Sequence, residues 1–592
     1  MSTKLPQLLP QPRRITPTSG VTSPRVARTT EPDASLPAEG FTLSIRPDAI
    51  RIRHADAAGL RFALATLAQI ESQAGPEGLP CLEIEDAPDF PVRGYMLDVS
   101  RDRVPTRATL ERIVDLMALL RLNHLQLYIE HTFAYPGHET VWRDASPLDA
   151  ADVVWLDEIC RARGIELVAN QNGFGHMGRW LKHDRYRPLA EAPDGWQTPW
   201  GTKAPPEVLY PDAASLDLVL GLYGELARHF TSRRINVGCD ETFELGQGRS
   251  RVEVASRGRG RVYLDYLLEI LASLHAQGKE VLFWGDVVRQ HPELVDEIPQ
   301  RDTIALAWHY EAPTDRPAFP ESLAETFAVL GMSPESLCGF EAHVAPFAGT
   351  GLPFWVCPGT STWNSLVGRL SNSMANLRDA AVVGRARGAS GYLVTDWGDN
   401  GHLQPPSVSF PPLVYGAALA WCADANRDLD VAAALDRFVF GDASGGLGAG
   451  LVLAGGVYER TGLGWFNGSP LFYRLLARGG PFAALGKATA GGVERATVEL
   501  EEAAALVAGS RPTCADGDVV RRELLQAIRL ARHGARRLAR DEGFAQHDDA
   551  DLRRDLTDAI AEQRACWALR SRPGGLDDSV ARLERTLTTY GV

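Results

Sequence analysis

The sequence predicts an α/β protein built around a (β/α)₈ (TIM) barrel, with a small α+β domain before the barrel and a helical domain after it. The chain has 592 residues, more than the roughly 250–300 residues that a single hydrophobic core usually holds. Eight short apolar runs alternate with helical stretches through its middle, and the chain becomes rich in Ala, Leu and Arg after about residue 425. We therefore predict an N-terminal α+β accessory domain over 1–90, the barrel over 91–425 and a C-terminal helical domain over 426–592.

The N-terminal domain is predicted from two kinds of hydrophobic spacing. Residues 41–54 (FTLSIRPDAIRIRH) alternate apolar and polar side chains, as in two short half-buried strands. Residues 57–74 place their leucines at helical spacing, and a further strand is expected at 81–86. The first 40 residues show little periodicity, and the prolines that follow the last strand mark a boundary.

The barrel is predicted from eight apolar runs that are mostly rich in β-branched or aromatic residues. The runs are 93–100, 124–131, 165–172, 234–241, 280–286, 303–310, 353–360 and 391–399. Helical stretches separate most of them, at 107–120, 150–163, 214–230, 262–277 and 366–387. Continuous apolar strands that alternate with helices indicate a parallel sheet covered on its faces. Eight such units over roughly 300 residues favour a barrel over an open sheet.

Nearly every apolar run ends in polar or aromatic side chains, and a barrel brings all its strand ends to one mouth. The residues at these ends are Arg101, Glu130, His131, Asn172, His176, Asp240, Glu241, Trp284, Asp286, Trp308, His309, Trp363, Asn364, Trp397 and Asp399. A doubly wound sheet would not gather all of these groups. We therefore expect one polar and aromatic cavity at the mouth.

The adjacent acids Asp240 and Glu241 follow an apolar strand, and Gly238 before them permits close backbone approach. Glycoside hydrolysis needs a proton donor for the leaving oxygen and a second group at the anomeric carbon. Sugar rings also need aromatic platforms for their apolar faces. We predict Asp240 and Glu241 as the catalytic pair. The predicted substrate-binding residues are Arg101, Glu130, His176, Trp284, Trp308, Trp363, Asn364, Trp397 and Asp399.

These motifs resemble glycoside hydrolase family 20, the β-N-acetylhexosaminidases, over roughly residues 5–425. The run INVGCDET resembles the family's His-x-Gly-Gly-Asp-Glu motif, and RGYMLDVSRDRVP resembles its first barrel strand, whose second arginine, here Arg101, binds sugar hydroxyls. NQNGFGHM resembles the strand that supplies an active-site histidine, here His176. FWGD, ALAWHYE and TDWGD resemble the segments of a tryptophan-lined pocket with a terminal acid, here Asp399.

The resemblance implies a retaining, exo-acting enzyme that releases terminal GlcNAc or GalNAc by substrate-assisted catalysis. Glu241 would protonate the glycosidic oxygen and later activate water. Asp240 would orient the substrate's 2-acetamido group, whose carbonyl oxygen attacks the anomeric carbon to give an oxazolinium ion. Glu241 would need a raised pKa, supplied by burial and by the charge of Asp240. The implied partner is a carbohydrate with a terminal N-acetylhexosamine, and no cofactor is expected.

Several residues depart from the family's pattern. The motif's histidine is Asn236 and its second glycine is Cys239, and the pair Glu130-His131 stands where paired aspartates are more usual. The tyrosine that usually binds the acetamide carbonyl has no clear counterpart, so Trp363 or Asn364 is expected to replace it. The departures leave the choice between GlcNAc and GalNAc open.

Two alternatives remain. Another barrel glycosidase, with its second carboxylate from Glu130 or Asp399, would act on sugars without a 2-acetamido group. A non-catalytic carbohydrate-binding protein would keep the cavity without the reaction. A metal site built from His131, His176 and Asp240 lacks any H-x-H or H-E-x-x-H spacing, and we expect no metal.

Composition excludes other classes. The formal net charge is −14 and no Lys/Arg-rich run occurs, which argues against a nucleic-acid partner. No stretch of about 18 apolar residues indicates a membrane span, and no secretory signal is visible, so we expect a cytoplasmic protein without a membrane partner. The eight scattered cysteines are expected to be free thiols.

The C-terminal domain is predicted from helical periodicity at 490–509, 517–540 and 549–571. The aromatic segment 457–475 precedes these helices. We expect this segment to cover a face of the barrel or to form a subunit interface, and a homodimer is therefore a prediction.

Overall fold

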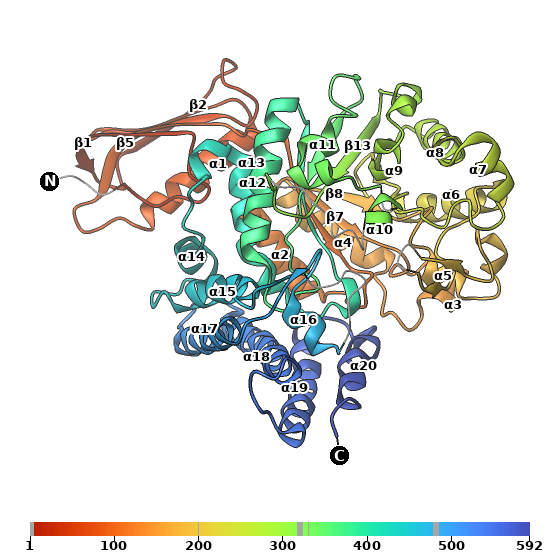
Figure 1. The fold of residues 1–592 in the computed structure, drawn as a ribbon. Coiled ribbons are helices and arrows are strands. Elements are labelled where there is room, and N and C mark those ends of the chain that lie inside the picture. The colour runs from red at the N-terminus through yellow and green to blue at the C-terminus, as the bar shows by residue number, and fades with distance from the viewer. Residues whose placement is uncertain (1–4, 199–200, 316–323, 330, 478–484, 592) are drawn as a thin grey trace.

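The computed structural model describes residues 5–198, 201–315, 324–329, 331–477 and 485–591. Eight parallel strands close a barrel in the order β11-β12-β13-β14-β15-β6-β7-β8 (Figure 1). Their bounds are β6 (Val92–Asp98), β7 (His124–Tyr128), β8 (Glu166–Asn170), β11 (Arg234–Asn236), β12 (Glu280–Trp284), β13 (Thr303–Trp308), β14 (Phe354–Cys357) and β15 (Gly391–Asp396). The predicted fold class is confirmed, with a strand inside seven of the predicted runs and β6 beginning one residue before the eighth, 93–100.

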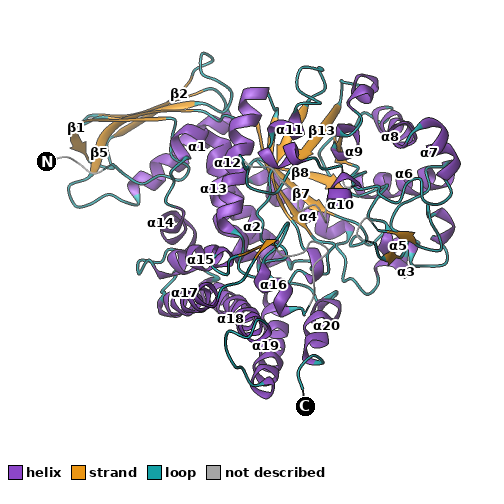
Figure 2. Cartoon of the chain, viewed as in Figure 1, coloured by secondary structure: helices purple, strands orange, loops and turns teal. Residues whose placement is uncertain are grey.

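Helices surround the barrel strands, as Figure 2 shows in purple around orange. The longer ones are α2 (Arg107–Leu119), α4 (Ala150–Ala162), α6 (Ala213–Ala227), α8 (Arg259–His275), α12 (Leu370–Arg387) and α13 (Phe410–Asn426). Local chemistry sets their ends. Asp149 and Asp152 form a capping box at the start of α4, and Gly388 ends α12 in the left-handed conformation.

Short helices occupy several connections between the strands. They are α3 (Glu139–Trp142), α5 (Gly178–Leu181), α7 (Arg251–Arg257), α9 (Asp286–Arg289), α10 (Ala324–Val329) and α11 (Glu341–Val344). Two of them, α9 and α11, follow β12 and β13 respectively and carry side chains that reach the barrel mouth.

The N-terminal domain is a five-stranded sheet, in the order β1-β5-β3-β4-β2, packed on one helix. The elements are β1 (Arg14–Thr22), β2 (Ala27–Pro32), β3 (Phe41–Ile45), β4 (Ala49–His54), α1 (Ala57–Glu71) and β5 (Leu79–Asp86). The prediction placed no strands in the first 40 residues and is wrong there. Every side chain of β2 is exposed and β1 is mostly exposed, so neither shows the apolar alternation that reveals a half-buried strand.

A buried charge network joins this domain to the barrel. Asp86 at the end of β5 accepts hydrogen bonds from Arg121 Nη1 at 2.8 Å and Trp421 Nε1 at 3.0 Å. The Arg121 guanidinium also lies over the Trp421 ring at 4.4 Å. Because each charge is paired, this contact ties the sheet to α2 and α13 without an isolated buried ion.

The C-terminal region is helical, as predicted, and lies below the barrel in the view of Figure 1. Its helices are α14 (Val431–Ala434), α15 (Gly446–Gly456), α16 (Pro470–Leu475), α17 (Ala490–Gly509), α18 (Gly517–Asp541), α19 (Asp549–Arg570) and α20 (Leu576–Leu587). Backbone bonds join it to the barrel: Thr106 N donates to Arg570 O at 2.9 Å and Arg572 N to Val104 O at 2.8 Å. Among the described residues, no helix has both the length and the apolarity that a membrane crossing requires.

Candidate active site

A cavity of about 800 Å³ opens at the carboxyl ends of the barrel strands. This is within the range of about 300–1,000 Å³ typical of ligand sites. Ten of the eleven residues predicted for the site line the cavity: Arg101, His176, Asp240, Glu241, Trp284, Trp308, Trp363, Asn364, Trp397 and Asp399. Glu130 is not among the lining residues.

A tight backbone turn directs the acid pair toward the cavity. After β11 the chain takes left-handed φ angles at Gly238 (70°), Cys239 (69°) and Glu241 (50°). At Gly238 a Cβ atom would lie 2.5 Å from the Asn172 side chain, so only glycine fits. Asn172 Oδ1 accepts a hydrogen bond from Cys239 N at 3.1 Å, which holds the turn. Left-handed conformations of non-glycine residues cost free energy and persist where the surroundings enforce them.

Asp240 is held as a carboxylate by two neighbours. Its Oδ1 accepts a hydrogen bond from Asn172 Nδ2 at 2.7 Å, and its Oδ2 lies 3.2 Å from His176 Nε2. Burial alone would raise the pKa of Asp240, but the His176 charge and these contacts bring it below its ordinary value. Burial alone would lower the pKa of His176, but the Asp240 charge outweighs burial and raises that pKa to about 10. The pair is therefore ionised at neutral pH.

Glu241 has the opposite electrostatic environment. Burial raises its pKa to about 7, assisted by the negative charge of Asp240 and opposed by the His176 cation. His176 Nε2 lies 3.5 Å from Glu241 Oε2. A carboxyl that exchanges its proton near neutral pH suits general acid–base chemistry, whereas its ionised neighbour suits charge stabilisation. The two acids thus have different protonation states.

Arg101 is fixed by contacts on several sides. Its Nη1 lies 3.1 Å from Asp98 Oδ2 and its Nε lies 3.3 Å from Glu130 Oε1. The guanidinium also lies over the rings of Tyr128, at 4.7 Å, and Trp397, at 4.9 Å. Glu130 is thus behind Arg101 and is not among the residues that line the cavity. Its position suits holding Arg101 rather than touching a sugar, in contrast to the predicted role.

Aromatic side chains surround the centre of the cavity, and one of them, Tyr310, is not among the predicted site residues. Tyr310 stacks on Trp308 at 5.1 Å and meets the Trp363 ring edge-on at 5.1 Å. Its hydroxyl oxygen accepts a hydrogen bond from Trp397 Nε1 at 2.9 Å. Tyr310 follows Trp308 by two residues and ends the predicted run 303–310. This strand-end position is the signal that would have identified it.

The C-terminal region contributes Phe466, Asn467 and Tyr473 to the cavity wall. Asn467 Oδ1 accepts a hydrogen bond from Trp363 Nε1 at 2.8 Å, and Asn467 O accepts one from Asn364 Nδ2 at 3.2 Å. The aromatic segment 457–475 therefore covers part of the barrel mouth, one of its two expected positions. No strand-end pattern marked these three residues.

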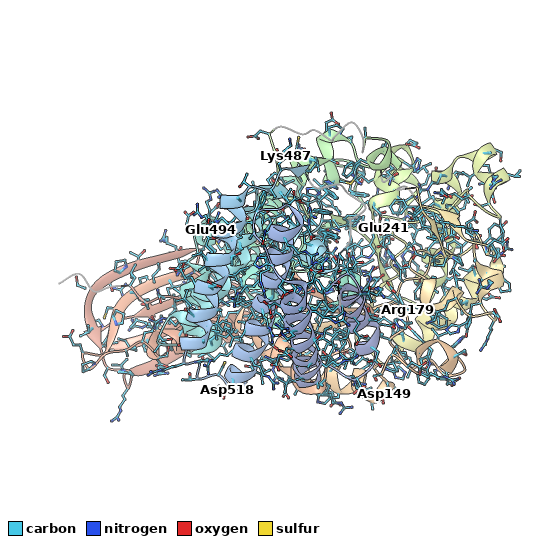
Figure 3. The ribbon with its side chains drawn as sticks, turned by 60° about the horizontal axis from the view of Figure 1, so that its bottom comes forward. Asp149, Arg179, Glu241, Lys487, Glu494 and Asp518 are labelled. Atoms are coloured by element: carbon cyan, nitrogen blue, oxygen red, sulfur yellow. The ribbon has the colours of Figure 1, made fainter. Side chains whose placement is uncertain are left out.

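The C-terminal helices also support the loops that carry Arg101 and Asp399. Asp102, next to Arg101, is ion-paired with Arg179 at 2.6 Å and with Arg582 of α20 at 3.2 Å; Arg179 is labelled in Figure 3, where the C-terminal helices come forward. Ser579 Oγ donates to Gly401 O, just after Asp399. These contacts link α20 to two sides of the site.

A third acid, Asp286, lies at the mouth beside Glu241, which is labelled in Figure 3. The backbone N of Glu241 donates to Asp286 Oδ2 at 3.1 Å. Burial and the Asp240 charge raise the pKa of Asp286 to about 6. Among the residues that the structure describes, no group of three or more His, Cys, Asp or Glu side chains is arranged to hold a metal ion.

Two family models match the first quarter of the chain. Residues 5–87 match domain 2 of glycosyl hydrolase family 20, and residues 90–140 match the catalytic domain of that family. The matches are consecutive, and they fall on the N-terminal sheet and the start of the barrel.

Curated relatives extend the similarity further along the chain. The β-hexosaminidase of Akkermansia muciniphila is 30% identical over 162 residues, which is 24% of this chain and 33% of that protein. β-Hexosaminidase 1 of Coccidioides posadasii is 29% identical over 301 residues, 46% of this chain and 49% of that protein. The similar part thus spans a third to a half of the length of these relatives.

A solved structure shares the fold over almost the whole chain. The chitobiase of Flavobacterium johnsoniae has a TM-score of 0.56 and 13% sequence identity, and the match covers 98% of this chain and 99% of that one. At this identity the likeness shows a common architecture, including the C-terminal region.

Proposed function

We propose that the chain belongs to glycoside hydrolase family 20 and that it is a retaining, exo-acting β-N-acetylhexosaminidase. It would release terminal GlcNAc or GalNAc through an oxazolinium intermediate. The observation that carries the proposal is the pair of adjacent acids with opposed pKa shifts, Asp240 lowered and Glu241 raised to about 7, on either side of His176.

In the first step of the proposed reaction, the two acids have separate roles. Glu241, protonated in a large fraction of molecules at neutral pH, donates its proton to the glycosidic oxygen as the bond to the anomeric carbon breaks. Asp240, ionised and held by Asn172 and His176, accepts a hydrogen bond from the acetamide N–H and stabilises the positive charge that develops there. The acetamide carbonyl oxygen then closes the oxazolinium ring.

Water completes the reaction. Glu241, now a carboxylate, removes a proton from a water molecule that attacks the anomeric carbon and opens the ring. Two displacements at one carbon retain its configuration. This scheme is the substrate-assisted exception to the two-carboxylate mechanism, in which a second protein carboxylate is the nucleophile.

We further propose how the terminal sugar is held. Trp397 provides a platform for the apolar ring face, while Arg101 and Asp399 bind hydroxyl groups. Arg101 is preorganised for this because Asp98 and Glu130 already fix its guanidinium.

The acetamide carbonyl needs a hydrogen-bond donor, and the sequence pointed to Trp363 or Asn364. The structure shows both donating to Asn467. We propose Tyr310 in their place. Its hydroxyl oxygen accepts a hydrogen bond from Trp397 Nε1 at 2.9 Å, and its O–H would donate to the acetamide carbonyl.

The test is hydrolysis of aryl 2-acetamido-2-deoxy-β-glycosides of the gluco and galacto series, compared with the matching aryl β-glucoside and β-galactoside. We expect turnover of at least one acetamido sugar and little turnover of the unsubstituted ones. The ratio of the two acetamido rates also measures the preference at O4. Turnover of the unsubstituted sugars alone would contradict the proposal.

A further inference from the structure

One wall of the cavity carries polar groups that the proposed reaction does not use. They are Arg289 on α9, His309 at the end of β13 and His343 on α11, beside Asp286. In the closed strand order, β12 and β6 stand four places apart, on opposite sides of the barrel. This wall, formed by Asp286, Arg289, His309 and His343, therefore faces Arg101 across the mouth. We call it the β12–β13 wall.

Arg289 lacks the partners that an arginine in a cavity usually has. Among the described residues, no carboxylate lies within 4.0 Å of it, and its hydrogen bond is from Nη2 to Gly331 O at 3.4 Å. Glu311, a nearby acid of the cavity, is already bound by Arg369 through two hydrogen bonds of 2.9 and 3.0 Å. Asp286 on the same helix favours the Arg289 charge from beyond 4.0 Å. A bound carboxylate would pair directly with this half-buried guanidinium through two parallel hydrogen bonds.

In addition to the Arg289 cation, the two histidines give this wall hydrogen-bond acceptors. Their rings stack at 4.3 Å and each is 3% exposed. His343 Nε2 is bonded to Ser336 O at 3.0 Å, so its proton lies there and Nδ1 is an acceptor. His343 Nδ1 and His309 Nε2 are buried and have no hydrogen-bond partner within the described ranges. Burial and the Arg289 charge lower the pKa of His309 to about 3, which keeps the ring neutral.

The β12–β13 wall lies next to the proton donor of the proposed reaction. Asp286 begins α9 and accepts a hydrogen bond from the Glu241 backbone, and Arg289 ends the same short helix. Because Glu241 protonates the leaving oxygen, groups beside it face the leaving part of the substrate. The cavity, at about 800 Å³, lies in the upper part of the range for ligand pockets of about 300–1,000 Å³.

We propose that the β12–β13 wall is a subsite for an acidic sugar on the leaving-group side, whose carboxylate pairs with Arg289 and whose hydroxyls bond to His309 and His343. A uronic acid has this chemistry. The inference rests on the proposed function and deepens it, since it names the class of sugar to which the terminal N-acetylhexosamine is linked.

The experiment compares two disaccharides that differ only in charge: a 2-acetamido-2-deoxy-β-glucoside of glucuronic acid and the same glycoside of glucose. We expect a kcat/KM for the acidic disaccharide about tenfold higher or more, as a charge-assisted pair gives. Arg289→Gln should remove most of this preference by raising KM for the acidic substrate. Arg289→Lys should keep part of it. Equal kcat/KM values for the two disaccharides in the wild-type enzyme would overturn the inference.

Three controls keep the outcomes separate. Arg301→Gln removes one positive charge from a side chain that is 95% exposed, and it should leave the preference unchanged. An aryl 2-acetamido-2-deoxy-β-glucoside tests the proposed function alone, and failure of the wild-type enzyme to cleave it would contradict that function. If the wild-type enzyme cleaves it but shows no preference for the acidic disaccharide over the neutral one, only the proposed subsite is contradicted. A 6-sulfated version of that aryl glycoside places the anion on the terminal sugar. A loss on Arg289→Gln confined to the sulfated substrate would contradict the leaving-group placement.

Discussion

The two opposite walls of the cavity differ in how their charges are satisfied. On the side of β6 and β15, Arg101 is paired with Asp98 and Glu130 and lies over two aromatic rings. On the side of β12 and β13, Arg289 has no carboxylate within 4.0 Å among the described residues, and two buried imidazole nitrogens have no partner there. The polar groups of the first wall have their partners before substrate binds, whereas the second wall has polar groups whose partners a substrate would supply.

This difference follows from what supports each wall. Behind Arg101 and Asp399 lie the C-terminal helices, which bond to both loops through Arg582 and Ser579. The β12–β13 wall rests on the short helices α9 and α11. A preorganised wall suits a sugar that is always the same, and a wall with unpaired groups suits the variable remainder of the substrate.

The largest effect is expected at the proton donor, which both walls need. Glu241→Gln should lower kcat/KM for a disaccharide by about 10²–10⁴-fold, the usual worth of general acid catalysis. An aryl glycoside with an acidic phenol needs less protonation and should lose much less. Comparing the two substrates measures this directly, and equal losses would contradict the role of Glu241.

Asp240→Asn should lower kcat/KM for both substrates by a similar factor, of the order of 10²–10³-fold, because the charge that stabilises the oxazolinium step is lost whatever the leaving group. The same pair of substrates gives the measurement. A loss that depends on the leaving group, as in Glu241→Gln, would show that the two acids share one role.

The next effect separates the walls. Arg101→Lys should raise KM about tenfold for the acidic and neutral disaccharides alike, because lysine cannot reproduce the fixed guanidinium contacts. Arg289→Gln should raise KM for the acidic disaccharide and leave KM for the neutral one unchanged. Steady-state kinetics on both substrates test the contrast, and a charge-dependent effect of Arg101→Lys would break it.

The pH dependence provides a smaller effect. Since Glu241 must be protonated to act and its pKa is raised to about 7, kcat/KM should fall as pH rises through about 7. At low pH, activity should hold until Asp240 is protonated, below the ordinary range of an aspartate because its pKa is lowered. Profiles of wild type and Glu241→Gln on an activated aryl substrate test this. If the alkaline limb persists in the variant, another group causes it.

The sequence predicted the barrel and most of the cavity for a common physical reason. Strand ends of a parallel barrel must converge, so residues such as Arg101, Glu241 and Trp397 could be brought together from apolar runs alone. Within those runs, order along the chain does not distinguish the residue that faces the cavity from the one behind it. That is why Glu130 was predicted to touch sugar although it lies behind Arg101.

Residues outside the strand ends could not be found in this way. Asn467 reaches the mouth from the C-terminal region, and His343 reaches it from a four-residue helix, so only tertiary packing brings them there. The exposed strands β1 and β2 lack an apolar face and were missed for that reason. The domain boundaries, the cytoplasmic location and the homodimer stay predictions.

The central claim is that the substrate's own acetamide attacks the anomeric carbon, and a series of aryl glycosides with zero to three fluorines on the N-acetyl methyl group tests it most directly. Each fluorine weakens the carbonyl oxygen as a nucleophile with little change in size. We expect kcat/KM to fall stepwise along the series, as it must if that oxygen closes the oxazolinium ring beside Asp240. A rate that does not respond to fluorination would contradict the claim, because a protein carboxylate would then be the nucleophile.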